Sequence, residues 1–380
     1  MIVRQFLEWM ETAPAERRAD AAHAMARAFL HSEVDDTARR GMEAALTVLL
    51  DDPSLAVRYA LADVFAAEPR APRHIVLTLA ADQFEIAGLI LSCSPLFIDV
   101  ELVDIAAAVD GPRQAAIASR LPVSTSLAAA LAEVGDAEAC RALLENPDAT
   151  IAAISLVRLA ERHGEDASIR DRLLARRDLP VDCRQRLIRG LGDRLGALVA
   201  ERQWIAPDRV QRVTREACER ATISIAAETA AEDLAALAEH LRITGQLTTA
   251  LLLRAVCAGN IPFLGAALAV LARMPERRVS AVLRADRAAA LKAVLGRAGI
   301  PASAFGAFIA AVEVVQDAAR APTPPGRLDL ARRTVEAVLA RYVEMTAGES
   351  NELAAMLRRF AADEARIEAR SLALSYRSAA

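Results

Sequence analysis

The sequence predicts an all-α protein, and two features of its composition support that class. Alanine accounts for 86 of the 380 residues, and alanine has the highest helix propensity of all residue types. Aromatic residues make up only 4% of the chain, whereas strands are enriched in aromatic and β-branched residues. The apolar fraction of 54% excludes a disordered chain, because it can offset the entropy lost on folding. No segment alternates apolar and polar residues between turn signals, so we expect essentially no strand.

Prolines mark the starts of several expected helices. Asp52-Pro53, Asn146-Pro147 and Leu179-Pro180 each precede a helical apolar pattern. Proline suits the first helical position because its missing N–H would have no intrahelical partner there. A preceding aspartate or asparagine can cap one of the free amides. We therefore expect helices to begin at these three points.

A weak internal repeat runs through the first half of the chain. Similar units start at Leu49, Leu79, Leu143 and Leu173: a helix ends in leucines, a polar turn follows, and a second helix begins. One such unit cannot bury its apolar stripe alone, but stacked units can, as in an α-solenoid. The unequal spacing predicts an irregular α-solenoid of HEAT-like helical repeats over residues 1–190.

Three further segments are expected after this array. Residues 191–317 have longer apolar patterns, which predict a helical bundle that continues the solenoid. Residues 318–326 form a Pro-rich linker, because clustered prolines stop a helix and favour an extended spacer. Residues 327–380 are expected to form a C-terminal amphipathic helical hairpin that can be removed without unfolding the rest. Its second helix carries Leu353, Phe360, Ile367 and Leu374 at seven-residue spacing.

That spacing suits a coiled-coil seam, although the intervening positions Glu364 and Ser371 are polar. The hairpin therefore has two interpretations. It folds back on itself or on the body, or it forms a homodimer or captures a partner helix.

Two stretches carry a resemblance to a known family. The first runs from Leu79-Ala80-Ala81-Asp82 through Ser92-Cys93-Ser94-Pro95-Leu96 to Leu102, and the second from Gly245-Gln246-Leu247-Thr248 through Gly259-Asn260-Ile261-Pro262-Phe263 to Ala269. Over residues 45–317 the chain resembles the bacterial domain-of-unknown-function family 2336. The resemblance implies a helical-repeat protein of the bacterial cytoplasm and gives no catalytic residues to transfer.

The chain lacks the motifs of common reaction chemistry. The segment Gly190-Leu191-Gly192-Asp193-Arg194-Leu195-Gly196 misplaces one glycine of a dinucleotide loop and follows no strand, so we expect a helix end and restart there. The five cysteines form no CxxC pair, and the five histidines are scattered. We expect no catalytic residue, no metal and no cofactor, and reduced, mostly buried cysteines.

The same sequence predicts a cytoplasmic protein without a membrane span. The N-terminus lacks the apolar core of a signal peptide. The longest apolar stretch, residues 247–272, is broken by Arg254, Asn260 and Pro262, so neither part is long enough to cross a bilayer.

Charge is distributed unevenly along the chain. Residues 1–169 have a net charge of −12, whereas residues 170–215 have a net charge of +6. The basic region either pairs with the acidic array or forms a groove for an acidic partner. Its candidate partner-binding residues are Arg176, Arg177, Arg184, Arg186, Arg189, Arg194 and Trp204.

These observations favour a non-enzymatic scaffold or adaptor that binds a partner protein. The alternative is a nucleic-acid-binding HEAT-like protein that uses residues 170–215, although the pI of about 5.9 disfavours it. A second alternative is an enzyme whose site is assembled from residues distant in sequence.

Overall fold

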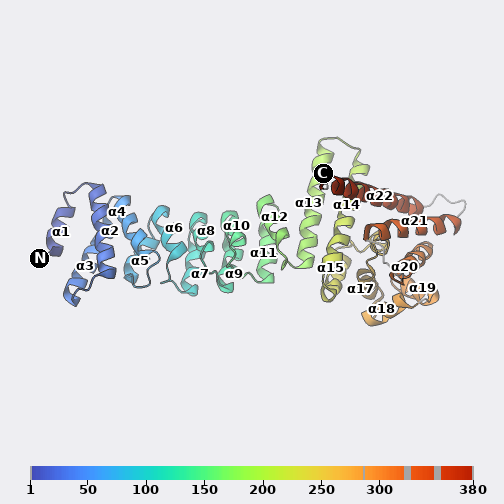
Figure 1. Ribbon diagram of the computed structural model, residues 1–380, viewed down its shortest axis with the longest axis horizontal. Helices are drawn as coiled ribbons and strands as arrows, with labels where there is room; N and C mark the ends of the chain where they lie inside the picture. The colour runs from blue at the N-terminus through green and yellow to red at the C-terminus, as the bar shows by residue number, and fades with distance from the viewer. Residues whose placement is uncertain (1, 286, 321–326, 346–351, 379–380) are drawn as a thin grey trace. The chain divides into compact units, whose positions relative to one another are not determined.

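The computed structural model describes residues 2–285, 287–320, 327–345 and 352–378 (Figure 1). The described residues form helices α1–α22 and three short 3-10 helices. No strand occurs among them, and a bridge between Val123 and Ala149 is their one isolated β-type pairing. The predicted all-α class is therefore confirmed.

The chain divides into two compact units, Met1–Pro180 and Val181–Ala380. The division coincides with Pro180, after which α13 begins at Val181 as the proline pattern predicts. The expected boundary at residue 190 falls inside this helix. Of the expected linker 318–326, residues 318–320 belong to the last turn of α20, and residues 321–326 lie outside the described part of the chain.

Unit 1 consists of short helices joined by tight turns. They are α1 (Ile2–Met10), α2 (Ala15–His31), α3 (Asp36–Val48), α4 (Leu55–Phe65), α5 (Arg73–Ala80), α6 (Phe84–Cys93), α7 (Asp99–Ala108), α8 (Gly111–Ala118), α9 (Thr125–Val134), α10 (Ala137–Glu145), α11 (Ala153–His163) and α12 (Ala167–Ala175). Several are capped by side chains: those of Asp35, Asp110, Ser124, Asp136 and Asp166 accept backbone N–H groups of the helices they precede.

The helices of unit 1 pack in two rows (Figure 1). In one row α2, α4, α6, α8, α10 and α12 each pack on the next of the six, and in the other α7, α9 and α11 pack in the same way. Alanine lines the contacts: Ala62, Ala87 and Ala128 are completely buried. Small side chains let the short helices approach closely, which agrees with the alanine-rich composition.

Arginine–aspartate clasps join successive turns of unit 1. Arg18 on α2 donates two hydrogen bonds of 2.8 Å to the Asp52 carboxylate. Arg58 on α4 donates to Asp82 at 2.7 and 3.0 Å and also to the Asp52 carbonyl. Bidentate guanidinium–carboxylate pairs are directional, so each clasp holds a turn in register with its neighbour. Asp82 therefore orients Arg58 and does not act as a free acid.

One helix of unit 1 begins later than its proline predicts. α11 starts at Ala153 and not at Asn146-Pro147. The Asn146 amide instead donates to the carbonyl oxygens of Ala118 and Arg120 at 2.8 and 2.7 Å. This asparagine is therefore used for a contact distant in sequence, which a local capping pattern does not reveal.

Unit 2 contains longer helices. They are α13 (Val181–Glu201), α14 (Pro207–Glu228), α15 (Leu234–Ile243), α16 (Thr249–Cys257), α17 (Ile261–Ala272), α18 (Glu276–Arg284), α19 (Ala288–Arg297), α20 (Phe305–Arg320), α21 (Arg327–Met345) and α22 (Glu352–Ser378). Those from α14 to α22 contribute to one apolar core, in which Phe263, Phe308 and Val338 are completely buried.

The stretch Gly245–Ala269 builds the centre of that core. Thr248 caps α16 by accepting the Leu251 N–H, and Asn260 caps α17 by accepting the Phe263 N–H. Gly245 and Gly259 adopt φ of 68° and 74°, a region that favours glycine because it lacks a Cβ. The distinctive residues of this stretch therefore serve helix ends and packing.

By length and composition, one helical stretch among the described residues could cross a bilayer, residues 302–320. Its Phe308 and Ala311 are completely buried in the core of unit 2.

Candidate partner-binding site on the α13–α14 hairpin

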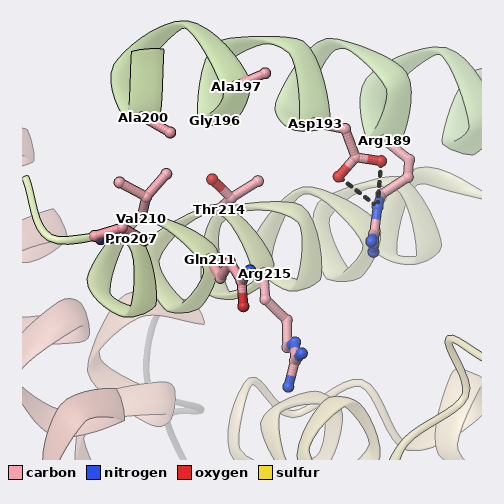
Figure 2. Close-up of a pocket in the computed structure, with 10 residues that line it drawn as sticks. All are labelled: Arg189, Asp193, Gly196, Ala197, Ala200, Pro207, Val210, Gln211, Thr214 and Arg215. Carbon is pink, nitrogen blue, oxygen red and sulfur yellow. Dashed lines mark hydrogen bonds and ion pairs between the residues drawn. The ribbon is translucent and has the colours of Figure 1, made fainter. Parts of the chain in front are cut away.

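Helices α13 and α14 form an antiparallel hairpin with an unusually close contact. Figure 2 shows Gly196, Ala197 and Ala200 of α13 opposite Val210 and Thr214 of α14. A Cβ atom at Gly196 would lie 2.7 Å from Thr214 Oγ1, and one at Gly192 would lie 2.4 Å from Cys218 Sγ. The two glycines therefore admit α14 to a distance that a larger residue would prevent.

The expected helix end and restart at residues 190–196 is wrong, because α13 is continuous over this segment. Glycine costs about 1 kcal/mol inside a helix relative to alanine. The prediction from the sequence took only this cost into account. The close packing on α14 offsets it.

The apex of the hairpin exposes large apolar side chains. Trp204 is 68% exposed in the connecting loop, beside Ile205 at 37%. Leu195 and Leu198 on α13 and Val213 on α14 are 53%, 44% and 46% exposed. Single exposed apolar residues are ordinary on protein surfaces, whereas five on one hairpin make it a candidate binding surface. We call these five residues the apex patch.

The candidate arginines lie in both units. Arg176 and Arg177 belong to unit 1, where Arg176 pairs with Asp178 at 2.7 Å and Arg177 is exposed. Arg184, Arg186, Arg189 and Arg194 all lie on α13 in unit 2, the unit that also contains the apex patch.

Two of the arginines on α13 pair with acids of the same helix. Arg189 Nε lies 3.0 Å from Asp193 Oδ2, and Arg186 lies 4.0 Å from Asp182. Such i, i+4 pairs are solvated and weak, and they reduce the positive charge that α13 offers to a phosphate backbone.

A cleft of about 390 Å³ lies between the two helices. Its lining residues are Arg189, Asp193, Gly196, Ala197, Ala200, Pro207, Val210, Gln211, Thr214 and Arg215 (Figure 2). The contributions of Gln211, Thr214 and Arg215 were not predicted. These three residues have helical spacing and so lie on one side of α14. The sequence could have indicated this only if the bounds of α14 had been predicted.

A buried charge cluster lies on the other side of α14. Arg254 on α16 is 3% exposed. Its Nε lies 3.6 Å from Glu219 Oε2 and its Nη1 lies 3.6 Å from Asp363 Oδ2. None of the three guanidinium nitrogens has a hydrogen-bond partner among the described residues. Burial raises the pKa of Glu219 despite the nearby Arg254 charge, and burial lowers the pKa of Arg254.

The C-terminal helix α22 packs against this cluster. Phe360 is 2% exposed, and Leu353 and Ile367 are half-buried. The fourth residue of the expected seam, Leu374, has a side chain outside those that the structure describes. Arg359 on α22 also donates to Glu216 on α14 at 2.8 Å. The seam residue Phe360 therefore packs in the core of its own chain.

Metal-ligating and nucleophilic groups do not gather anywhere in the described residues. No group of three or more His, Cys, Asp or Glu side chains there could hold a metal ion. All five cysteines are free and four of them are buried, as predicted. Burial raises the pKa of Cys140 to about 11 and that of Cys257 to about 12, so neither is a reactive thiolate at neutral pH.

A bacterial family described as "Uncharacterised protein conserved in bacteria (DUF2336)" matches residues 86–348 of the chain. No curated protein and no solved structure matches it.

Proposed function

Since the chain belongs to this uncharacterised bacterial family, we propose from its own residues that it is a non-enzymatic scaffold or adaptor that binds a partner protein. The apex patch carries the proposal. Tryptophan and arginine are the residues that most often dominate the energy of protein interfaces. The hairpin that carries Trp204 also carries exposed apolar side chains on α13 and α14 and several arginines.

The packing of unit 1 supports the scaffold assignment. Helices that pack on their second neighbours in two rows are what an irregular α-solenoid of HEAT-like repeats requires, and such arrays offer extended binding surfaces. We therefore assign unit 1 to that class. We also assign the protein to the cytoplasm, where its free cysteines stay reduced.

Two further candidates are weaker. A nucleic-acid-binding role would use the arginines of residues 170–215, but Arg176, Arg186 and Arg189 already face carboxylates. Mobility shift at about 50 mM salt tests it, because phosphate contacts are strongest at low salt. A homodimer through α22 would require Phe360 to leave the core of unit 2.

Site-specific photocrosslinking tests the proposal. A benzophenone amino acid replaces Trp204 in the intact chain, in the bacterium that carries the gene. The matched control replaces Ile243, which is 70% exposed at the end of α15 in the same unit. We expect a discrete protein adduct from position 204 that position 243 does not give. Equal adducts at the two positions, or none at 204, contradict the proposal.

A further inference from the structure

Three clefts adjoin around α14. The cleft between α13 and α14 has a volume of about 390 Å³, and two others have about 370 and 330 Å³. The first and second share Gln211 and Arg215, and the second and third share Arg215 and Glu219. Arg215 lines all three. The clefts are therefore neighbours, and we call the three together the α14 groove.

The length of the α14 groove suits a helical segment. Its lining residues on α14 run from Pro207 to Thr222, which at 1.5 Å per residue is a span of about 22 Å. A partner helix of about 15 residues, or four turns, covers that distance.

Apolar residues line part of each cleft, together with charged ones. Ala197, Ala200 and Val210 line the first cleft, Ala250, Met356 and Phe360 the second, and Leu241 and Leu251 the third. An occupant must bring apolar side chains on one face, as an amphipathic helix does when it lies in a groove.

Most carboxylates of the groove form ion pairs within the chain, whereas two of its arginines do not. Three of its four carboxylates already face an arginine of this chain: Asp193 faces Arg189, Glu216 faces Arg359 and Glu219 faces Arg254. The fourth, Asp208, lines the second cleft and is exposed.

Two arginines remain for an occupant. Arg212 and Arg215 are exposed, and neither has an ion pair within 4 Å among the described residues. Arg215 is near enough to Glu219 to oppose the rise of that carboxyl's pKa. In Figure 2 its side chain leaves α14 on the side away from α13. The groove thus presents two guanidinium groups and one carboxylate, Asp208, that have no ion pair within 4 Å among the described residues.

We infer that the α14 groove binds an acidic amphipathic helix of a partner protein, whose apolar face fills the clefts and whose carboxylates contact Arg212 and Arg215. This inference rests on the proposed function and names the chemistry of the partner. Guanidinium groups bind carboxylates with directional, bidentate geometry. A nucleic acid would also contact Arg212 and Arg215, so it is measured beside the peptides. A flat lipid surface cannot enter a groove between helices.

The docked C-terminal helix completes the groove. Met356, Arg359 and Phe360 on α22 form the wall of the second cleft opposite Arg212 and Arg215. Arg359 holds Glu216 and so removes a carboxylate that would repel an acidic occupant.

Fluorescence anisotropy with designed helical peptides tests the inference on the full chain. The labelled probe has about 15 residues, with leucine at i, i+3, i+4 and i+7 on one face and glutamate elsewhere. Two matched peptides carry lysine or glutamine in place of each glutamate. We expect the glutamate peptide to bind about tenfold more tightly than the lysine peptide, with an affinity that falls as salt rises.

The double variant Arg212→Glu/Arg215→Glu should reverse the preference between the two charged peptides. Arg17→Glu, at an exposed arginine of α2 in unit 1, is the control and should leave binding unchanged. Circular dichroism melts establish whether each variant is folded. If the double glutamate variant is not folded, Arg212→Ala/Arg215→Ala is used in its place. Equal binding of the charged peptides, or glutamate-peptide binding that the double variant leaves unchanged, overturns the inference.

Single-stranded DNA and phosphatidylglycerol vesicles are measured with the same variants. If Arg212 and Arg215 are needed for either of these and the glutamate peptide does not bind, the groove belongs to another class of ligand and the inference is wrong. The proposed function is tested separately by crosslinking at position 204. A protein adduct there, together with failure of the glutamate peptide, would leave the scaffold assignment intact and refute only the partner chemistry.

Discussion

The guanidinium carbon of Arg254 on α16 lies 3.8 Å from the ring centroid of Phe360 on α22. A cation over an aromatic face is attractive, most strongly when both groups are removed from water. Here Arg254 is 3% exposed and Phe360 is 2% exposed. The last helix of the chain therefore shields a buried charge of the body.

Replacement of Phe360 by alanine should destabilise unit 2 strongly. Truncation of a buried phenylalanine costs about 3–5 kcal/mol, because a cavity adds to the lost burial. The variant would also admit water to Arg254. Denaturant unfolding followed by circular dichroism measures the loss, with Ile243→Ala, an exposed site in the same unit, as control. A loss no larger than that of the control would show that α22 is not part of the folded core.

Deletion of residues 321–380 should also destabilise the remainder of unit 2. The sequence predicted that this hairpin is removable. In the structure, however, Val335, Val338, Leu357 and Phe360 lie in the same core as α14 to α20. Their removal exposes the facing apolar surface to water. Thermal melts of the shortened chain, compared with the full chain, decide between the two predictions; an unchanged unfolding temperature supports the removable hairpin.

The glycines of α13 should respond in opposite ways to alanine. Gly192→Ala and Gly196→Ala force α14 away, and overpacking of this kind costs about 1–3 kcal/mol. At Gly190 a Cβ meets nothing within 4 Å, so Gly190→Ala should instead stabilise the helix by about 0.5–1 kcal/mol. Denaturant unfolding of the three variants measures the contrast, and equal effects at all three positions would refute the close-contact explanation.

The Arg58–Asp82 clasp should make unit 1 sensitive to acid. Burial alone would raise the pKa of Asp82, but hydrogen bonds from Arg58 and the Gln83 N–H lower it overall. A lowered pKa in the folded state stabilises the protein above the unfolded value of about 3.9, and this contribution is lost as pH falls through the folded value.

Thermal melts across a pH series measure this loss, which Asp82→Asn should remove and the exposed control Asp104→Asn should retain. A double-mutant cycle of Arg58→Ala and Asp82→Ala should give a coupling of about 1–2 kcal/mol. A coupling near zero would show that the clasp is only a surface contact.

One cysteine should react in the native protein. Cys93 is exposed, whereas Cys140, Cys183, Cys218 and Cys257 are buried. Ellman's reagent should therefore titrate one thiol quickly and the others only after unfolding. Cys93→Ser should abolish the fast phase, and a second fast thiol in that variant would contradict the burial.

The sequence predicted the helical class and the helix start after Pro180, because these depend on local propensity and periodicity. It misjudged the segment around Gly192 and Gly196, because a pattern of glycines reports backbone cost but not the helix that packs against it. It likewise placed the start of α11 too early, because the Asn146 amide bonds to carbonyls of Ala118 and Arg120. Contacts between residues distant in sequence decided both cases.

The candidate site was predicted in part. Trp204 and the arginines of α13 were identified from composition and charge, and whether they bind a partner stays a prediction. Arg212 and Arg215 could not be distinguished from their neighbours, because what sets them apart is their place along a groove that α16 and α22 also line.

The exposure of Trp204 has a spectroscopic consequence. The chain has two tryptophans, Trp9 and Trp204, and both indoles remain in contact with water in the folded protein, 41% and 68% exposed. Folding therefore changes the environment of neither ring as much as burial beneath a partner would. The intrinsic emission of this protein is a poor measure of its unfolding, and a natural probe of what covers the apex patch.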